Sequence, residues 1–219
     1  KQLISAKRFG MEEFHEERQE NRSEFQRDYD RLIFSAPFRR LQNKTQVFPL
    51  PGSVFVHNRL THSLEVASVG RSLGDDVAKA LLERHPELQD SFLPEIGSIV
   101  SAACLAHDLG NPPFGHSGEK AISTFFSEGK GVRLKEKQPN GEQLSPMEWE
   151  DLTHFEGNAN AFRILTHQFE GRRKGGFVLT YTTLASIVKY PFSSSLAGTK
   201  SKFGFFVSEE ESFQKIAKI

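Results

Sequence analysis

Four ionisable side chains surround one rigid turn in the stretch Ala106-His107-Asp108-Leu109-Gly110-Asn111-Pro112-Pro113-Phe114-Gly115-His116-Ser117-Gly118-Glu119. The apolar run over residues 99–105 before it predicts a buried helix rich in small residues. Because proline cannot continue a helix and disfavours helical angles in the residue before it, this helix is expected to end before Pro112. If a second helix begins beyond the turn, His116 and Glu119 share one of its faces. The stretch therefore predicts a catalytic centre.

His107 and Asp108 form a pair suited to binding a metal ion. An imidazole nitrogen and a carboxylate oxygen fit Mn²⁺ or Mg²⁺, with Zn²⁺, Fe²⁺ and Ni²⁺ as alternatives. The chain has a single cysteine, Cys104, which argues against a cysteine-ligated structural zinc site. Two side chains cannot hold a catalytic ion alone. We expect the third ligand to be His62, early in an amphipathic segment that predicts a helix to about Glu83.

Composition indicates an ordinary globular protein. The 219 residues are 37% hydrophobic and 26% charged, enough to bury a substantial core as one domain. Lys plus Arg and Asp plus Glu each number 28, so net charge does not indicate a nucleic acid partner. We find no apolar stretch of membrane-spanning length and no signal-peptide pattern, and therefore expect no membrane partner and a cytoplasmic location.

Several blocks of sequence resemble a known enzyme family. Three of them, Arg59–Val66, His107-Asp108 and Pro112–Glu119, resemble the HD superfamily of metal-dependent phosphohydrolases. Two more, Arg39–Pro49 and His154–Asn160, are similar to the deoxyguanosinetriphosphate triphosphohydrolase family within it. The resemblance runs from about residue 25 to the end of the chain and implies an all-α fold, an HD-domain helical bundle.

The resemblance also implies a reaction and a set of residues that perform it. The reaction is metal-dependent hydrolysis of deoxynucleoside triphosphates, with dGTP as the expected substrate, to a deoxynucleoside and tripolyphosphate. A homo-oligomer is implied as well. The implied metal ligands are His62, His107 and Asp108, the catalytic pair is His116 with Glu119, and the substrate contacts are Gln46 at the deoxyribose and Lys189, Tyr190 and Lys202 at the triphosphate.

Two other functions stay open at this level. His62 with His107 and Asp108 would equally serve an HD-type phosphodiesterase or nucleotidase. The third hypothesis is a catalytically incomplete nucleotide-binding fragment, since the resembling family takes a fourth ligand, an aspartate, from a later helix. On that basis residues 24–219 are expected to be the N-terminal part of a longer catalytic domain.

The remaining expectations concern the order of elements along the chain. Residues 1–23 are polar and predict an arm or a frayed helix, while residues 127–150 form a long polar insertion that predicts a loop or a short hairpin. Predicted helices begin at Ser23 and near Pro94, and others cover residues 115–127, 154–169 with Glu156 and Asn158 capping it, 179–190 and 209–219.

Overall fold

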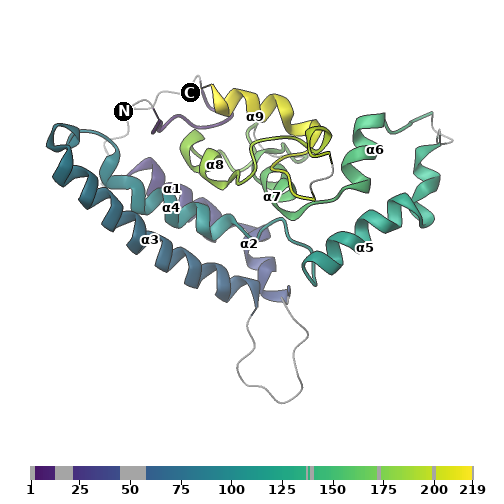
Figure 1. Ribbon diagram of the computed structural model, residues 1–219, viewed down its shortest axis with the longest axis horizontal. Coiled ribbons are helices and arrows are strands. Elements are labelled where there is room, and N and C mark those ends of the chain that lie inside the picture. The colour runs from purple at the N-terminus through teal and green to yellow at the C-terminus, as the bar shows by residue number, and fades with distance from the viewer. Residues whose placement is uncertain are drawn as a thin grey trace, which may run out of the picture.

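A computed structural model describes residues 3–12, 22–44, 58–136, 138, 141–171, 174–198 and 201–218. Within these ranges the chain is helical, and its β-structure is limited to two isolated bridges, so the all-α prediction is confirmed (Figure 1). The α-helices are α1 Glu24–Ile33, α2 Ala36–Arg40, α3 Arg59–Arg84, α4 Ile96–Ala106, α5 His116–Ser127, α6 Pro146–Thr153, α7 Gly157–Thr166, α8 Tyr181–Ile187 and α9 Glu210–Ala217.

Helices α3 and α4 form an antiparallel pair that organises the molecule (Figure 1). Their backbones approach closely, because a Cβ on Gly74 would lie 2.8 Å from the Cα of Gly97. Asn58 caps α3 by accepting a hydrogen bond from the Thr61 N–H at 2.9 Å, so His62 lies in the first turn. The antiparallel arrangement therefore places the start of α3 beside the end of α4.

The hydrophobic core lies on the other side of α4, which α1 and α8 cover. α4 is buried along most of its length, as its small apolar residues predict. The largest fully buried side chains packed there come from six helices and the turn after α4, and include Leu32, Phe38, Leu105, Leu109, Phe162, Leu165, Leu184 and Ile216.

Part of the segment predicted as an arm belongs to this core. Phe9 is 8% exposed and packs in the main cluster, and its N–H donates to Leu179 O at 3.0 Å. Arg8 donates to the fully buried Asp28 on α1 at 2.7 Å. Asp28 also accepts from Thr180, at 2.9 Å from the backbone N–H and at 2.6 Å from the hydroxyl. Burial raises the pKa of Asp28 even though these donors oppose that shift.

The polar insertion also contains helical structure that the sequence analysis did not predict. Residues Lys130–Lys135 form a 3₁₀-helix and α6 begins at Pro146, so a loop or hairpin over 127–150 is wrong for these residues. Ser145 and Glu148 form a reciprocal capping box, with the Ser145 side chain accepting from the Glu148 N–H at 3.2 Å. α5, the 3₁₀-helix and α6 form a lobe that stands beside the main body (Figure 1).

Helix α8 is shorter than predicted. It ends at Ile187, because Val188 has extended backbone angles (φ −75°, ψ 92°). Lys189 and Tyr190 therefore follow the helix and do not form its last turn. Pro191 accounts for part of this, since a proline pushes the residue before it, here Tyr190, toward extended conformations. The β-branched side chains of Ile187 and Val188 also disfavour a helix at its end.

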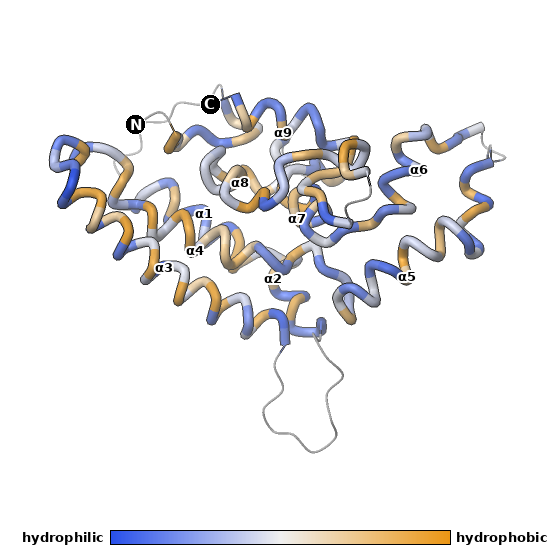
Figure 2. The backbone as a smooth tube through the Cα atoms, in the orientation of Figure 1, coloured by the Kyte–Doolittle hydropathy of each residue, from blue (hydrophilic) through white to orange (hydrophobic). Residues whose placement is uncertain are grey.

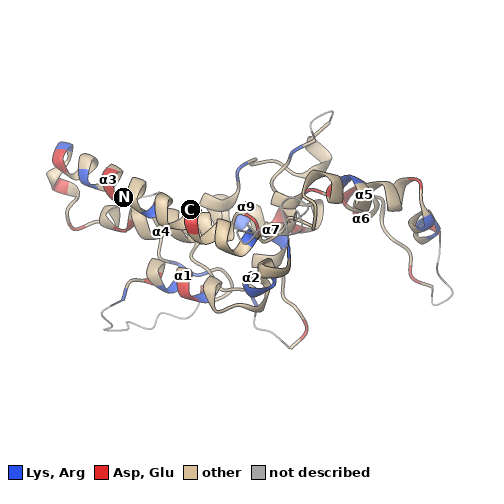
Figure 3. Ribbon diagram, turned by 90° about the horizontal axis from the view of Figure 1, so that it is seen from below, with Lys and Arg blue, Asp and Glu red and all other residues tan. Residues whose placement is uncertain are grey.

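One helix exposes a row of apolar residues. In Figure 3 basic and acidic positions are interspersed along the described helices. On α3, Val69, Leu73 and Val77 are each at least half exposed, and apolar positions recur along the whole helix in Figure 2. In the described part of the chain, no helix has both the length and the apolar character that crossing a bilayer requires.

The cap of α1 supports a first testable prediction. The Ser23 hydroxyl accepts from the Gln26 N–H at 3.2 Å and donates to Glu95 at 2.8 Å, so it caps α1 and ties it to the segment before α4. We expect Ser23→Ala to lower the free energy of unfolding by about 1–2 kcal/mol in urea denaturation. Ser145→Ala, which removes a similar capping box on an exposed helix, is the matched control and should cost less. Equal losses would mean that the Glu95 contact contributes nothing.

Candidate metal centre and adjoining cavity

The start of α3 and the end of α4 bring three predicted ligands together. His62, His107 and Asp108 each offer one ligand atom, and these atoms all lie within 4.8 Å of one another. The two imidazole rings meet edge to face, with centroids 5.3 Å apart. Asp108 is 4% exposed and both histidines are half-buried, so the group lies where the core meets solvent. Elsewhere in the described ranges no comparable group of His, Cys, Asp or Glu occurs.

A local hydrogen bond decides which nitrogen of His107 faces this group. Nδ1 lies 2.6 Å from Cys104 O, and a carbonyl oxygen only accepts, so Nδ1 carries the proton. In the neutral ring Nε2 is then the nitrogen with a free lone pair, and it lies 3.4 Å from Asp108 Oδ1. Histidines that bind metals usually donate their other ring N–H to a carbonyl or carboxylate in this way. His107 is therefore in the tautomer that a metal ligand needs.

Asp108 is held at both of its oxygens. Arg59 Nη1 donates to Oδ2 at 2.8 Å, and Asn111 Nδ2 donates to Oδ1 at 2.5 Å. Arg59 lies one turn before His62 on α3, and Asn111 lies in the turn that follows Asp108. These hydrogen bonds fix the direction of the carboxylate, as the partners of ligating carboxylates do in metal sites.

The donor set fits a divalent cation. Two imidazole nitrogens and a carboxylate oxygen suit Mn²⁺, Mg²⁺, Zn²⁺, Fe²⁺ or Ni²⁺ and do not distinguish among them. Two atoms bound at right angles to one ion, each about 2.1 Å from it, are about 3 Å apart. The 3.4 Å between His107 Nε2 and Asp108 Oδ1 is close to that separation. We therefore describe the group as a candidate metal centre.

Positive charge surrounds the buried carboxylate. Lys44 lies at the end of the short 3₁₀-helix Leu41–Asn43, and its ammonium donates to Asn111 O at 3.0 Å. Burial lowers the pKa of Lys44 and the charge of Arg59 lowers it further, while Asp108 opposes both effects. Two cations therefore accompany one carboxylate, an arrangement that attracts anionic groups.

Helix α5 presents the second predicted pair. Gly115 adopts φ +55° immediately before α5, and the His116 side chain is 82% exposed. His116 Nδ1 lies 2.8 Å from Glu119 Oε2. Burial raises the pKa of Glu119, but hydrogen bonds from His116 and the Gly157 N–H, together with Lys202, outweigh it and leave the pKa below its usual value. An ionised glutamate only accepts, so His116 Nδ1 carries a proton in a side chain that is largely exposed.

Lys202 joins this pair to the start of α7. Its ammonium lies 2.9 Å from Glu156 Oε1 and 3.3 Å from Glu119 Oε2, and burial lowers its pKa less than the two carboxylates raise it. Glu156 is 1% exposed and caps α7 by accepting from the Asn158 and Ala159 N–H groups, so its predicted capping role is confirmed. The two carboxylates therefore hold the Lys202 ammonium in a defined position beside His116 and Glu119.

The two groups of side chains are joined through the start of α7. Gly157 donates its N–H to Glu119 Oε1 at 2.9 Å. A Cβ at Gly157 would lie 2.0 Å from Asn111 Oδ1, so only glycine permits this contact. Asn111 in turn holds Asp108. The candidate metal centre and the His116–Glu119 pair are thus connected through Asn111 and Gly157.

A cavity of about 500 Å³ lies between α5, α6 and the segment after α8. Its lining carries five hydroxyl side chains and two lysines, which can donate to phosphate, and also two glutamates, Glu119 and Glu150. His154 lies on it and was not predicted as a site residue, because its sequence block has no metal-ligand spacing. The lining side chains include His116, Glu119, Lys120, Ser123, Thr153, His154, Ser194, Ser195, Ser201 and Lys202.

The other predicted substrate contacts are placed differently. Gln46 falls within residues 45–57, outside the described residues. Lys189 and Tyr190 contact each other, with the ammonium 5.7 Å from the ring centroid. Neither residue is among the described residues that line the cavity. The structure thus brings His116, Glu119 and Lys202 together at the cavity, whose described lining does not include Lys189 or Tyr190.

Comparisons with known proteins agree with this geometry. The family model for the HD domain matches residues 59–180. A deoxyguanosinetriphosphate triphosphohydrolase-like protein of Synechocystis is 46% identical over 99% of this chain and 50% of its own length. One of Pseudomonas aeruginosa is 47% identical over 94% of this chain and 46% of its own. A deoxyguanosinetriphosphate triphosphohydrolase of Yersinia enterocolitica is 37% identical over 96% of this chain and 46% of its own length. The chain spans about half the length of these curated relatives.

Proposed function

The chain belongs to the HD-domain family, and from that premise we propose that the protein hydrolyses deoxynucleoside triphosphates, with dGTP as the preferred substrate. The products would be a deoxynucleoside and inorganic tripolyphosphate. The names of the similar proteins from Synechocystis and Pseudomonas aeruginosa support this substrate class. His62, His107 and Asp108 are the proposed ligands of a divalent metal ion, Mn²⁺ or Mg²⁺ first.

One observation carries the proposal. The three candidate ligands lie within 4.8 Å of one another, and Asn111 and Gly157 connect them to a histidine–glutamate pair and a lysine. A bound divalent ion polarises a phosphoryl oxygen and lowers the pKa of water. The protein's own side chains supply what remains, which is proton transfer and the binding of a highly charged substrate.

In the proposed reaction the oxygen of water forms a bond to the α-phosphorus, and the bond from that phosphorus to the 5′-oxygen breaks. The 5′-oxygen leaves as the hydroxyl of the deoxynucleoside, and the three phosphates leave as tripolyphosphate. The His116 side chain is largely exposed while Glu119 holds Nδ1, so His116 is the proposed proton carrier, either from the attacking water or to the 5′-oxygen.

The substrate contacts follow from charge and position. Lys202 and the hydroxyl-lined cavity beside His116 are the proposed site of the phosphate chain. Gln46 stays the proposed contact to the deoxyribose, and Lys189 and Tyr190 stay proposed phosphate contacts. The predicted homo-oligomer and cytoplasmic location also remain predictions.

Product analysis tests the proposal. The protein at its natural length is incubated with each of the four deoxynucleoside triphosphates, with and without Mn²⁺, and the products are separated by anion-exchange chromatography. We expect a deoxynucleoside and tripolyphosphate in equal amounts, only with the metal, and fastest from dGTP. Monophosphate products would favour the phosphodiesterase or nucleotidase hypothesis. Binding without turnover would favour the nucleotide-binding module.

A further inference from the structure

Lys44 contacts both segments that carry the candidate metal ligands. Its backbone carbonyl accepts a hydrogen bond from the Arg59 N–H at 3.1 Å, at the start of α3. Its ammonium donates to Asn111 O at 3.0 Å and, more weakly, to Leu109 O at 3.4 Å, in the turn after α4. One residue therefore joins the segment of His62 to the segment of Asp108.

The partners of Lys44 are also the residues that hold Asp108. Arg59 donates to Oδ2 at 2.8 Å, and Asn111 donates to Oδ1 at 2.5 Å. Lys44 thus contacts the backbone of both donors, one through its carbonyl and the other through its ammonium. A displacement of the Asn111 backbone would move the amide group that orients the carboxylate.

The chemistry of this position suits a lysine. The turn after α4 presents carbonyl oxygens with no further helical turn to satisfy them, and a cation is favourable at such a helix end. A lysine ammonium carries three donors and serves both carbonyls at once. Lys44 is half-buried, so losing its donors would leave Asn111 O and Leu109 O without these partners in a partly desolvated place.

We infer that Lys44 is a positioning residue of the metal centre, which acts on Asp108 through Arg59 and Asn111. This inference depends on the proposed metal centre. Partners in this outer position of metal sites typically change metal affinity by about 10- to 100-fold when they are removed.

The test is Lys44→Met, which keeps the length of the side chain and removes its donors. Mn²⁺ affinity is measured on the protein at its natural length by isothermal titration calorimetry and by electron paramagnetic resonance. We expect the dissociation constant to rise about 10- to 100-fold, and saturating Mn²⁺ to restore most of the turnover. Lys44→Arg, which keeps donors for the carbonyls, should lie nearer the wild type. Lys79→Met, an exposed lysine further along α3, is the matched control.

The outcomes separate the possible failures. If the wild type binds Mn²⁺ and Lys44→Met binds it equally well, the role of Lys44 is overturned while the metal centre stands. If the wild type binds no divalent ion, both proposals fail. A purely structural role would lower the melting temperature of the metal-free protein without weakening metal binding in the folded fraction, and would also overturn the inference. If Lys44→Met does not fold, Lys44→Gln, which removes the charge and shortens the side chain, replaces it: weakened Mn²⁺ binding supports the inference, and binding at the wild-type level overturns it.

Discussion

Asp108→Asn is expected to lower metal-dependent turnover by about 10³-fold or more, because it removes the only carboxylate among the candidate ligands in the described residues. The substitution keeps the size of the side chain and an oxygen that accepts from Arg59. It also removes the negative charge that compensates a guanidinium 5% exposed to solvent. Steady-state turnover of dGTP checks the loss of activity, and direct measurement of bound Mn²⁺ checks the expected loss of the metal ion.

The control for Asp108→Asn is Asp76→Asn, which makes the same change on an exposed position of α3. It should leave turnover and metal content as in the wild type. Prolonged treatment of the wild type with a chelator should reproduce the loss, and added Mn²⁺ should reverse it there but not in Asp108→Asn. Full metal binding by Asp108→Asn would remove Asp108 from the ligand set.

His116→Ala is the second large effect, expected to lower turnover by about 10²- to 10⁴-fold, the usual range for a general acid or base. The reason is positional: Glu119 holds Nδ1 at 2.8 Å, and the ring is exposed at the edge of the hydroxyl-lined cavity. Bound Mn²⁺ should stay at the wild-type level, because His116 is not one of the three candidate ligands. The pH dependence of turnover should lose the limb that reports this histidine.

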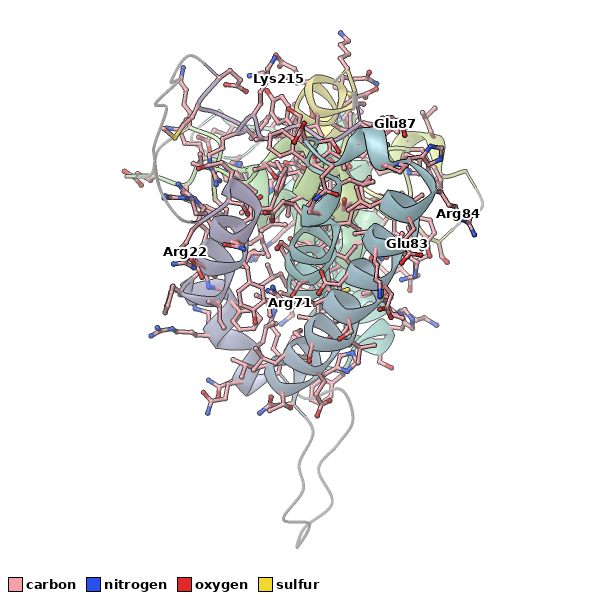
Figure 4. The ribbon with its side chains drawn as sticks, turned by 90° about the vertical axis from the view of Figure 1, so that its left-hand side faces the viewer. Arg22, Arg71, Glu83, Arg84, Glu87 and Lys215 are labelled. Carbon is pink, nitrogen blue, oxygen red and sulfur yellow. The ribbon has the colours of Figure 1, made fainter. Side chains whose placement is uncertain are left out.

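The matched control for His116→Ala is His85→Ala. His85 is also an exposed histidine beside a glutamate, with Nδ1 3.2 Å from Glu87 Oε1. It follows α3 at the end opposite His62, near the labelled Glu83, Arg84 and Glu87 in Figure 4. We expect no change in turnover. If His116→Ala and His85→Ala behave alike, His116 has no part in the proton transfer.

Much of the local structure could be predicted because its causes are local. The helix before Pro112 ends ahead of that residue, at Ala106, as predicted. Ser23 caps α1 and Glu156 caps α7, each by accepting from N–H groups two or three residues away. The capping box at Ser145 and Glu148 belongs to the same class. It was present in the sequence but was obscured by the polar composition around it.

The approach of His62 to His107 and Asp108 depends on more than local signals. The periodicity of α3 and the small residues of α4 favour two helices that pack closely, and the resemblance named the residues that should meet. Gly74 against Gly97 then permits the close contact that brings the helix ends together. The ligand types were therefore determined by the sequence, and their mutual distances by the packing of the two helices.

Several features followed from tertiary contacts alone. The sequence around Phe9 predicts a polar arm. In the structure the Phe9 N–H donates to Leu179 O and Arg8 donates to the buried Asp28, so this segment belongs to the core. His154 becomes a lining residue of the cavity only through the packing of α6 beside α5. The extended angles at Val188 end α8 before Lys189 and Tyr190, against their helical periodicity.

The sequence by itself determined the helical class, the ends of its main helices and the chemistry of the candidate ligands, because propensity, capping and proline act over a few residues. Only the tertiary structure decided which charged and polar groups meet. Lys44 with Asn111, Lys202 with Glu156 and Arg59 with Asp108 are separated by 67, 46 and 49 positions. Such pairs form because burial makes each partner require the other, and burial is a property of the packed chain.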